Sequence, residues 1–238
     1  MIVLACALVA WWLVRPAAAP PAFRSVRFET ASGGTVQYAL YTPPHVSSAP
    51  THPLIVFLHG GRECGRDGAR HLIVGPSVHV NRAHPDFYLL MYQAADEDWS
   101  PWSTNAANLT AAVEHAVAHF PIDPDRVSLT GHSSGGSGVW ALAVANPRRW
   151  SALAPVCGIG DPATVRVLRH LPVWIFQGEL DGQDYVANAD AMARALRAAG
   201  GDVRYSRFPD EGHLVWPCVY LNTEVYAWLT AKRRTGGV

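Results

Sequence analysis

The sequence predicts a three-layer α/β/α sandwich built on a mostly parallel sheet, with an antiparallel hairpin at its start and no large cap domain. Segments of five or six apolar residues, typical of strands buried on both faces, alternate along the chain with segments of helical spacing. The 238 residues are 49% hydrophobic and 16% charged, which suits one globular domain with a sizeable core. The formal net charge is zero and the basic residues are scattered, so we expect no nucleic-acid partner.

The elements follow from these patterns in chain order. Two alternating segments, Phe23–Glu29 and Thr35–Tyr41, flank a glycine turn and predict the hairpin. The later strands are expected at Leu54–Leu58, Phe87–Tyr92, Val127–Thr130, Ala152–Val156, Val173–Gln177 and Val203–Phe208. The helices are expected at Arg70–Val80, Ala106–His119, Val139–Asn146, Val186–Ala199 and Val219–Thr230.

The first residues differ from the rest of the chain. Ile2–Val14 is almost wholly apolar, Arg15 and Pro16 end it, and Ala17–Ala19 supplies small residues for cleavage. This order predicts a signal peptide at 1–19, a catalytic domain at 20–238, and export to the periplasm or medium. An uncleaved membrane anchor and a mis-assigned start codon are the alternatives, and no other membrane partner is expected.

The central motif is Gly131-His132-Ser133-Ser134-Gly135, which lies between a predicted strand and a predicted helix. In so tight a turn Ser133 must take strained backbone angles, and side chains at the two glycines would collide with it. The turn would expose the hydroxyl of Ser133 and aim the N–H of Ser134 at a developing oxyanion. By itself, the motif also occurs by chance in glycine-rich chains.

Three further candidates also follow predicted strands: Gly61, Asp181 and His213. The carboxyl ends of parallel strands meet at one edge of a sheet, so these residues should lie near Ser133. We expect Ser133 as nucleophile, His213 as its base and Asp181 as the group that orients the base. Gly61 and Ser134 would supply the two N–H groups of an oxyanion hole. Asp184 and Glu179 are the alternatives to Asp181.

Three tryptophans, Trp99, Trp102 and Trp216, fall on loops at the same end of the sheet. They would either line an apolar or aromatic acyl pocket or belong to the ordinary core. His132 is expected to pack beneath the serine turn. No metal-ligand spacing is present, and we expect neither a metal nor a cofactor.

Several segments resemble the phospholipase/carboxylesterase-like group of α/β-hydrolases, closest to its branch of exported predicted peptidases, polyhydroxybutyrate-depolymerase-like and feruloyl-esterase-like proteins. The similar segments are Leu58–Gly61, Arg126–Gly136, Trp140–Ala143, Ala154–Gly158, Leu171–Trp174 and Gly212-His213. The resemblance implies the α/β-hydrolase fold and carries over Ser133, Asp181, His213 and the Gly61 N–H. Arg62 departs from the group's common glycine, and Gln177 replaces its usual histidine at a position expected to lie away from the chemistry.

Of the four cysteines, Cys6 would leave with the signal peptide, and the other three allow at most one disulfide. Cys157 and Cys218 are the expected pair, because they follow elements that end at the same rim. The alternative is three buried thiols.

Together these features predict a serine hydrolase that cleaves small-molecule or polymeric carboxylic esters through an acyl-serine intermediate. A prolyl-oligopeptidase-like peptidase and a catalytically inactive binding protein are the alternatives. No oligomeric state is indicated by the sequence.

Overall fold

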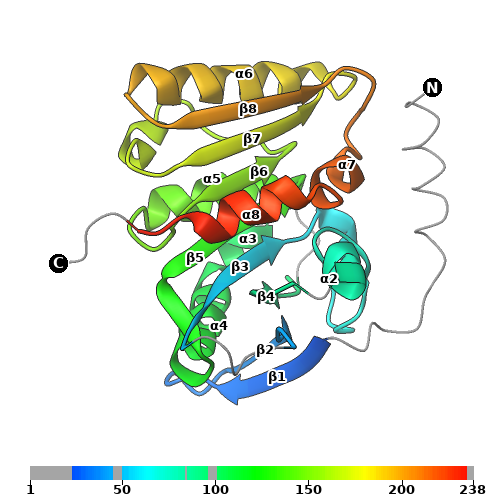
Figure 1. Cartoon of the computed structure of the whole chain (residues 1–238), viewed down its shortest axis with the longest axis vertical. Coiled ribbons are helices and arrows are strands. Elements are labelled where there is room, and N and C mark those ends of the chain that lie inside the picture. Colours follow the sequence, from blue (N-terminus) through cyan, green and yellow to red (C-terminus); the bar gives the residue numbers. More distant parts are fainter. Residues whose placement is uncertain (1–22, 45–49, 84, 96–100, 235–238) are drawn as a thin grey trace.

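The computed structural model describes residues 23–44, 50–83, 85–95 and 101–234, and its centre is one eight-stranded sheet (Figure 1). The strand order is β1-β2-β4-β3-β5-β6-β7-β8; β1 and β2 pair antiparallel, as do β2 and β4, and all later neighbours pair parallel. The strands are β1 (Phe23–Glu29), β2 (Thr35–Tyr41), β3 (His52–Leu58), β4 (Tyr88–Met91), β5 (Ile122–His132), β6 (Leu153–Val156), β7 (Val173–Gly178) and β8 (Val203–Phe208). The predicted fold class, including the hairpin, is confirmed.

Helices cover both faces of this sheet. They are α2 (Ser77–Ala83), α3 (Pro101–Thr104), α4 (Ala106–His119), α5 (Ser134–Ala145), α6 (Gln183–Ala198), α7 (Trp216–Tyr220) and α8 (Thr223–Ala231), with short 3-10 turns η1 (Gly61–Glu63), η2 (Arg70–Ile73) and η3 (Val165–Leu168). Helices α4, α5 and α6 pack on one face, and α2, α7 and α8 on the other (Figure 1). None of the helices within the described ranges is both long and apolar enough to cross a membrane.

Strand β3 shows why the strands have continuous apolar sequences. All seven of its residues are buried. Leu54, Val56 and Leu58 belong to the core on the α4–α6 face, while Ile55 and Phe57 belong to the core on the other face. Side chains of a strand alternate between faces, so a strand covered on both sides needs apolar residues at every position.

The last predicted helix, Val219–Thr230, is wrong in one respect, because two helices occupy this region. Helix α7 starts earlier, at Trp216, and ends at Tyr220. Asn222 then starts α8, and its side chain accepts a hydrogen bond from the N–H of Glu224 at 3.0 Å. An asparagine cap competes with helix continuation, so the apolar spacing runs on while the backbone breaks. Similarly, the predicted segment Arg70–Val80 divides into η2 and the start of α2.

The turn between β5 and α5 is as tight as the sequence predicts. Ser133 has φ 60° and ψ −122°, an unusual conformation for a residue with a side chain. A Cβ on Gly131 would lie 2.6 Å from the carbonyl oxygen of Gly135. A Cβ on Gly135 would overlap the carbonyl oxygen of Leu58. These close approaches between backbones require glycine at both positions.

We therefore expect Gly135→Ala to lower the free energy of unfolding by at least about 3 kcal/mol, because no flexible side chain can move aside. This corresponds to a melting temperature lower by about 6–12 °C, measured by circular dichroism. Gly34→Ala is the matched control, since its new Cβ would meet nothing closer than Thr30 Oγ1 at 3.4 Å. Equal stability of the two variants would contradict this steric account.

Candidate active site

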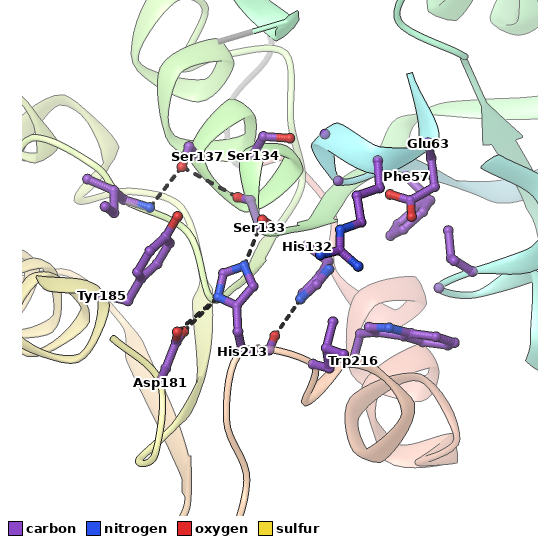
Figure 2. A pocket seen from close by; sticks show the side chains of 17 residues that line it. Phe57, Glu63, His132, Ser133, Ser134, Ser137, Asp181, Tyr185, His213 and Trp216 are labelled. Carbon is purple, nitrogen blue, oxygen red and sulfur yellow. Dashed lines mark hydrogen bonds and ion pairs between the residues drawn. The ribbon is translucent and has the colours of Figure 1, made fainter. Parts of the chain in front are cut away.

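A pocket of about 970 Å³ lies at the carboxyl ends of the central strands (Figure 2). The five residues expected to carry the chemistry all line it: Gly61, Ser133, Ser134, Asp181 and His213. The parallel register places their loops together, because the last residue of β3, Leu58, is level with Gly131 of β5. The loop after β7 is tied to the loop after β8 by a hydrogen bond from the N–H of Leu180 to the carbonyl of Glu211, at 2.9 Å.

Ser133, His213 and Asp181 form a continuous hydrogen-bonded chain (Figure 2). Nε2 of His213 lies 2.8 Å from Oγ of Ser133, and Nδ1 lies 2.9 Å and 3.0 Å from the two carboxylate oxygens of Asp181. An ionised carboxylate only accepts, so Nδ1 must carry the proton toward Asp181. Nε2 of the neutral ring is then free to accept the hydroxyl proton of Ser133.

The carboxylate of Asp181 is held in its charged form. Its side chain is only 4% exposed, and this burial by itself would raise the pKa. Hydrogen bonds from His213, from Nε2 of Gln177 at 2.9 Å and from the N–H of Gly182 at 2.7 Å outweigh burial and keep the pKa of Asp181 below its usual value. The group facing the imidazole is therefore an anion at neutral pH.

The segments of the proposed oxyanion hole lie close together. A Cβ built on Gly61 would be 3.9 Å from Oγ of Ser134. Ser134 is the first residue of α5, where the backbone N–H groups have no partner within the helix. His59 holds the Gly61 loop: its Nδ1–H donates to the carbonyl of Gly60 at 2.6 Å, and its Nε2 accepts the N–H of Ala94 at 2.9 Å.

Comparisons with known proteins agree with this architecture. Residues 92–168 match the prolyl oligopeptidase family. The chain is 26% identical over 155 residues to S-formylglutathione hydrolase of Rattus norvegicus, covering 51% of this chain and 52% of that protein. It is 40% identical over 73 residues to the protein of the same name from Mus musculus, covering 28% of this chain and 25% of that protein.

The structural comparison covers more of the chain. A crystal structure of a thermostable esterase superimposes with a TM-score of 0.79 and 25% identity, covering 91% of this chain and 64% of that one. The chain has the α/β-hydrolase fold. The resemblance to carboxylesterase-like α/β-hydrolases is thereby confirmed. This α/β-hydrolase chain spans about half the length of the rat relative it matches.

The expectation of export is wrong for this α/β-hydrolase. The curated relatives from rat, mouse and Bos taurus are S-formylglutathione hydrolases, which are cytosolic enzymes. Residues 1–19, predicted as a signal peptide, lie outside the described residues.

The three tryptophans of this α/β-hydrolase have different positions. Trp216, the first residue of α7, lines the pocket. Trp102 is 1% exposed and packs against Gly138 and the ring of His59, so it belongs to the core and not to the pocket wall. Trp99 lies outside the described residues. A tryptophan on a loop near strand ends does not reveal by sequence which way its ring points.

Two side chains contact the candidate triad in ways that the sequence did not indicate. Gln177, expected to lie away from the chemistry, donates to Oδ2 of Asp181. His132, expected only to pack, donates from Nε2 to the backbone carbonyl of His213 at 2.7 Å (Figure 2). It thereby fixes the loop that carries His213. Gln177 lies in β7 and contacts the loop that follows this strand, whereas His132, the last residue of β5, contacts the loop after β8. No spacing in the sequence encodes either contact.

The expected disulfide is also wrong, because no bond joins Cys157 to Cys218 within the described chain. Cys157 is buried, and its sulfur lies within 4.8 Å of the ligand atoms of Asp181 and His213. Burial raises the pKa of its thiol to about 12. Cys218 instead directs its sulfur toward Glu211, at 3.5 Å. Cys157, Asp181 and His213 could together face a metal ion, but Nδ1 of His213 already donates its proton to Asp181.

Three buried histidines predict an acid-sensitive stability. Burial lowers the pKa of His59, His71 and His132 to about 4, against an ordinary value of 6.5. Between these values the unfolded chain binds protons that the folded chain excludes. The three histidines therefore do not reduce the free energy of unfolding above pH 6.5. As the pH is lowered toward 4, the free energy of unfolding falls by at most about 3 kcal/mol per histidine.

Urea denaturation over this pH range, at constant ionic strength, measures the effect. We expect His132→Gln to reduce the slope of stability against pH, because one of the three groups is gone. His170→Gln is the control, since His170 is exposed. Unchanged stability of the parent protein between pH 7 and pH 4.5 would contradict the assignment of neutral buried rings.

Proposed function

We propose that residues 20–238 form a serine hydrolase that cleaves carboxylic esters through an acyl-Ser133 intermediate. The observation that carries this proposal is the hydrogen-bonded chain from Ser133 through His213 to Asp181, which opens into a pocket. The similarity to S-formylglutathione hydrolases and to a thermostable esterase supports the same class of reaction.

The proposed reaction has two stages. His213 Nε2 takes the hydroxyl proton as Ser133 Oγ attacks the ester carbonyl, and the Asp181 carboxylate stabilises the resulting imidazolium. The N–H groups of Gly61 and Ser134 bind the oxyanion of the tetrahedral intermediate. The imidazolium then protonates the departing alcohol as the C–O bond breaks. In the second stage water attacks the acyl-enzyme, with His213 again as base, and releases the acid.

The pocket wall favours substrates with an apolar group near the ester. Its apolar side chains are Phe57, Val74, Ile159, Tyr185, Leu214 and Trp216. Ile159 and Leu214 remain 41% and 66% exposed, so they offer apolar surface that a substrate could cover. We expect the substrates to be small esters or the chain end of a polymeric ester. The substrate named for the rat and mouse relatives is a thioester, which the same acyl-transfer chemistry would cleave.

The proposal is tested by labelling the pure protein with a fluorophosphonate probe and by assaying p-nitrophenyl acetate and p-nitrophenyl butyrate. We expect stoichiometric labelling, located at Ser133 by peptide mass spectrometry, and turnover of both esters. A protein that neither reacts with the probe nor hydrolyses either ester would instead be a binding protein with a hydrolase fold.

Peptide hydrolysis is the second candidate, favoured by the match of residues 92–168 to the prolyl oligopeptidase family. The matched range contains Ser133 but neither Asp181 nor His213. The match therefore covers the turn at Ser133 and not the complete candidate site. A prolyl p-nitroanilide peptide and a p-nitrophenyl ester, assayed side by side, separate the two. Release of p-nitroaniline without ester turnover would favour the peptidase.

A further inference from the structure

Arg62 places a permanent positive charge on the wall of the pocket. It follows directly after Gly61, it is exposed, and it is the one lysine or arginine among the described residues that line this pocket. Neither an ion pair nor a hydrogen bond from its guanidinium is present within the described part of the chain. By contrast, six other arginines, at 70, 149, 204, 207, 233 and 234, pair with carboxylates.

Among the described residues that line the pocket, neither acidic residue forms an ion pair with Arg62, and both accept hydrogen bonds from other groups. The carboxylate of Glu63 is turned back onto the backbone N–H groups of Gly60 and of Glu63 itself. Burial raises the pKa of Glu63, while these backbone hydrogen bonds and the nearby charge of Arg62 lower it. The carboxylate of Asp181 accepts hydrogen bonds from His213, Gln177 and Gly182. The cation of Arg62 is therefore available to a ligand.

The position of Arg62 limits what that ligand can be. Gly60 lies against the nucleophile, since a Cβ built on it would be 3.6 Å from Cβ of Ser133. Arg62 is two residues further along, so its side chain starts close to the reacting atoms. Phe57, Val74 and Trp216 line the same pocket, with apolar surface. A molecule that uses all of these contacts has an ester carbonyl, a short apolar spacer and an anion.

We propose that Arg62 binds a carboxylate of the substrate, so that the site prefers esters with a negative charge a few bonds from the scissile carbonyl. This inference rests on the ester hydrolase function proposed above and specifies its substrate class. The planar guanidinium can donate two parallel hydrogen bonds to a carboxylate, a geometry that lysine does not reproduce. The positive potential at the mouth would also speed the arrival of anionic substrates.

Matched pairs of substrates isolate the charge. For a charge on the acyl side, mono-p-nitrophenyl adipate is compared with methyl p-nitrophenyl adipate, in which the free carboxylate is esterified. For a charge on the alcohol side, 4-acetoxybenzoate is compared with methyl 4-acetoxybenzoate. The ratio of kcat/KM, anionic over neutral, is measured for each pair in the parent protein and in four variants, so intrinsic reactivities cancel. The variants are Arg62→Ala, Arg62→Lys, Arg62→Glu and the control Arg66→Ala, whose arginine is exposed and does not line the pocket.

We expect Arg62→Ala to lower this ratio about five- to tenfold in at least one pair, with turnover of the neutral ester within about twofold of the parent. Arg62→Lys should keep part of the preference, Arg62→Glu should reverse it, and Arg66→Ala should leave it unchanged. Higher ionic strength should weaken the preference of the parent protein.

Two results would overturn the proposal without touching the hydrolase function. One is an unchanged ratio in both pairs with unchanged turnover of every ester; the other is an unchanged ratio with an equal loss for anionic and neutral esters. The second result would show that Arg62 only supports the shape of the Gly61 loop. Absence of any ester turnover in the parent protein would instead refute the hydrolase function, and this substrate class with it.

Discussion

Replacing Ser133 by alanine is expected to lower kcat for p-nitrophenyl butyrate roughly 10⁴- to 10⁶-fold. The variant lacks the oxygen that would form the acyl bond, while His213 keeps its hydrogen bond to Asp181 and the backbone of the turn is unchanged. Residual hydrolysis would come from binding and from the oxyanion hole. Steady-state assays at high protein concentration, together with fluorophosphonate labelling, measure both the loss and its origin.

Ser134→Ala is the matched control for this experiment. Oγ of Ser134 is buried with no hydrogen-bond partner among the described residues, and alanine keeps the backbone N–H assigned to the oxyanion. We expect kcat within about threefold of the parent value, because only an unpartnered hydroxyl is removed. Similar rates for Ser133→Ala and the parent protein would show that Ser133 is not the nucleophile.

The fold could be predicted because its inner strands, β3, β4, β6 and β7, are buried along their whole length and need apolar residues on both faces. Strand β8 and helix α4 begin and end at the predicted residues, and the hairpin β1–β2 does as well. The predictions failed where periodicity gives no information. The break at Asn222 depends on a single capping side chain, which an apolar pattern that continues on both sides conceals.

The candidate site was predictable for a topological reason. Parallel strands bring their carboxyl ends to one edge of the sheet, so the residues after β5, β7 and β8 lie near that edge whatever the conformation of the loops. The direction in which each side chain points carries no such constraint. Neither the hydrogen bond from Gln177 to Asp181 nor the one from His132 to the His213 carbonyl could be read from spacing. The orientation of Trp102 and the separate partners of the cysteines were hidden for the same reason.

Asp181→Asn is expected to reduce kcat by roughly 10⁴-fold with little change in the position of the neighbouring loops. In the parent protein each carboxylate oxygen of Asp181 accepts a hydrogen bond from a fixed donor: Oδ1 from the N–H of Gly182, and Oδ2 from Nε2 of Gln177. An amide group at this position directs an N–H₂ at one of these donors or at His213. When the N–H₂ faces Nδ1 of His213, it donates to that nitrogen and favours the imidazole tautomer with the proton on Nε2, which cannot accept the proton of Ser133.

The alternatives considered for this role supply the controls. Asp184, in the first turn of α6, is exposed, and Glu179 pairs with Arg207 at 2.9 Å, so neither faces His213. We expect Asp184→Asn and Glu179→Gln to keep kcat within about twofold, because the hydrogen bonds of the imidazole are unchanged. A loss in Asp184→Asn as large as that in Asp181→Asn would reassign the acid. Circular dichroism of all three variants separates the loss of the hydrogen bond that orients His213 from a loss of the fold, since only the second lowers the melting temperature along with kcat.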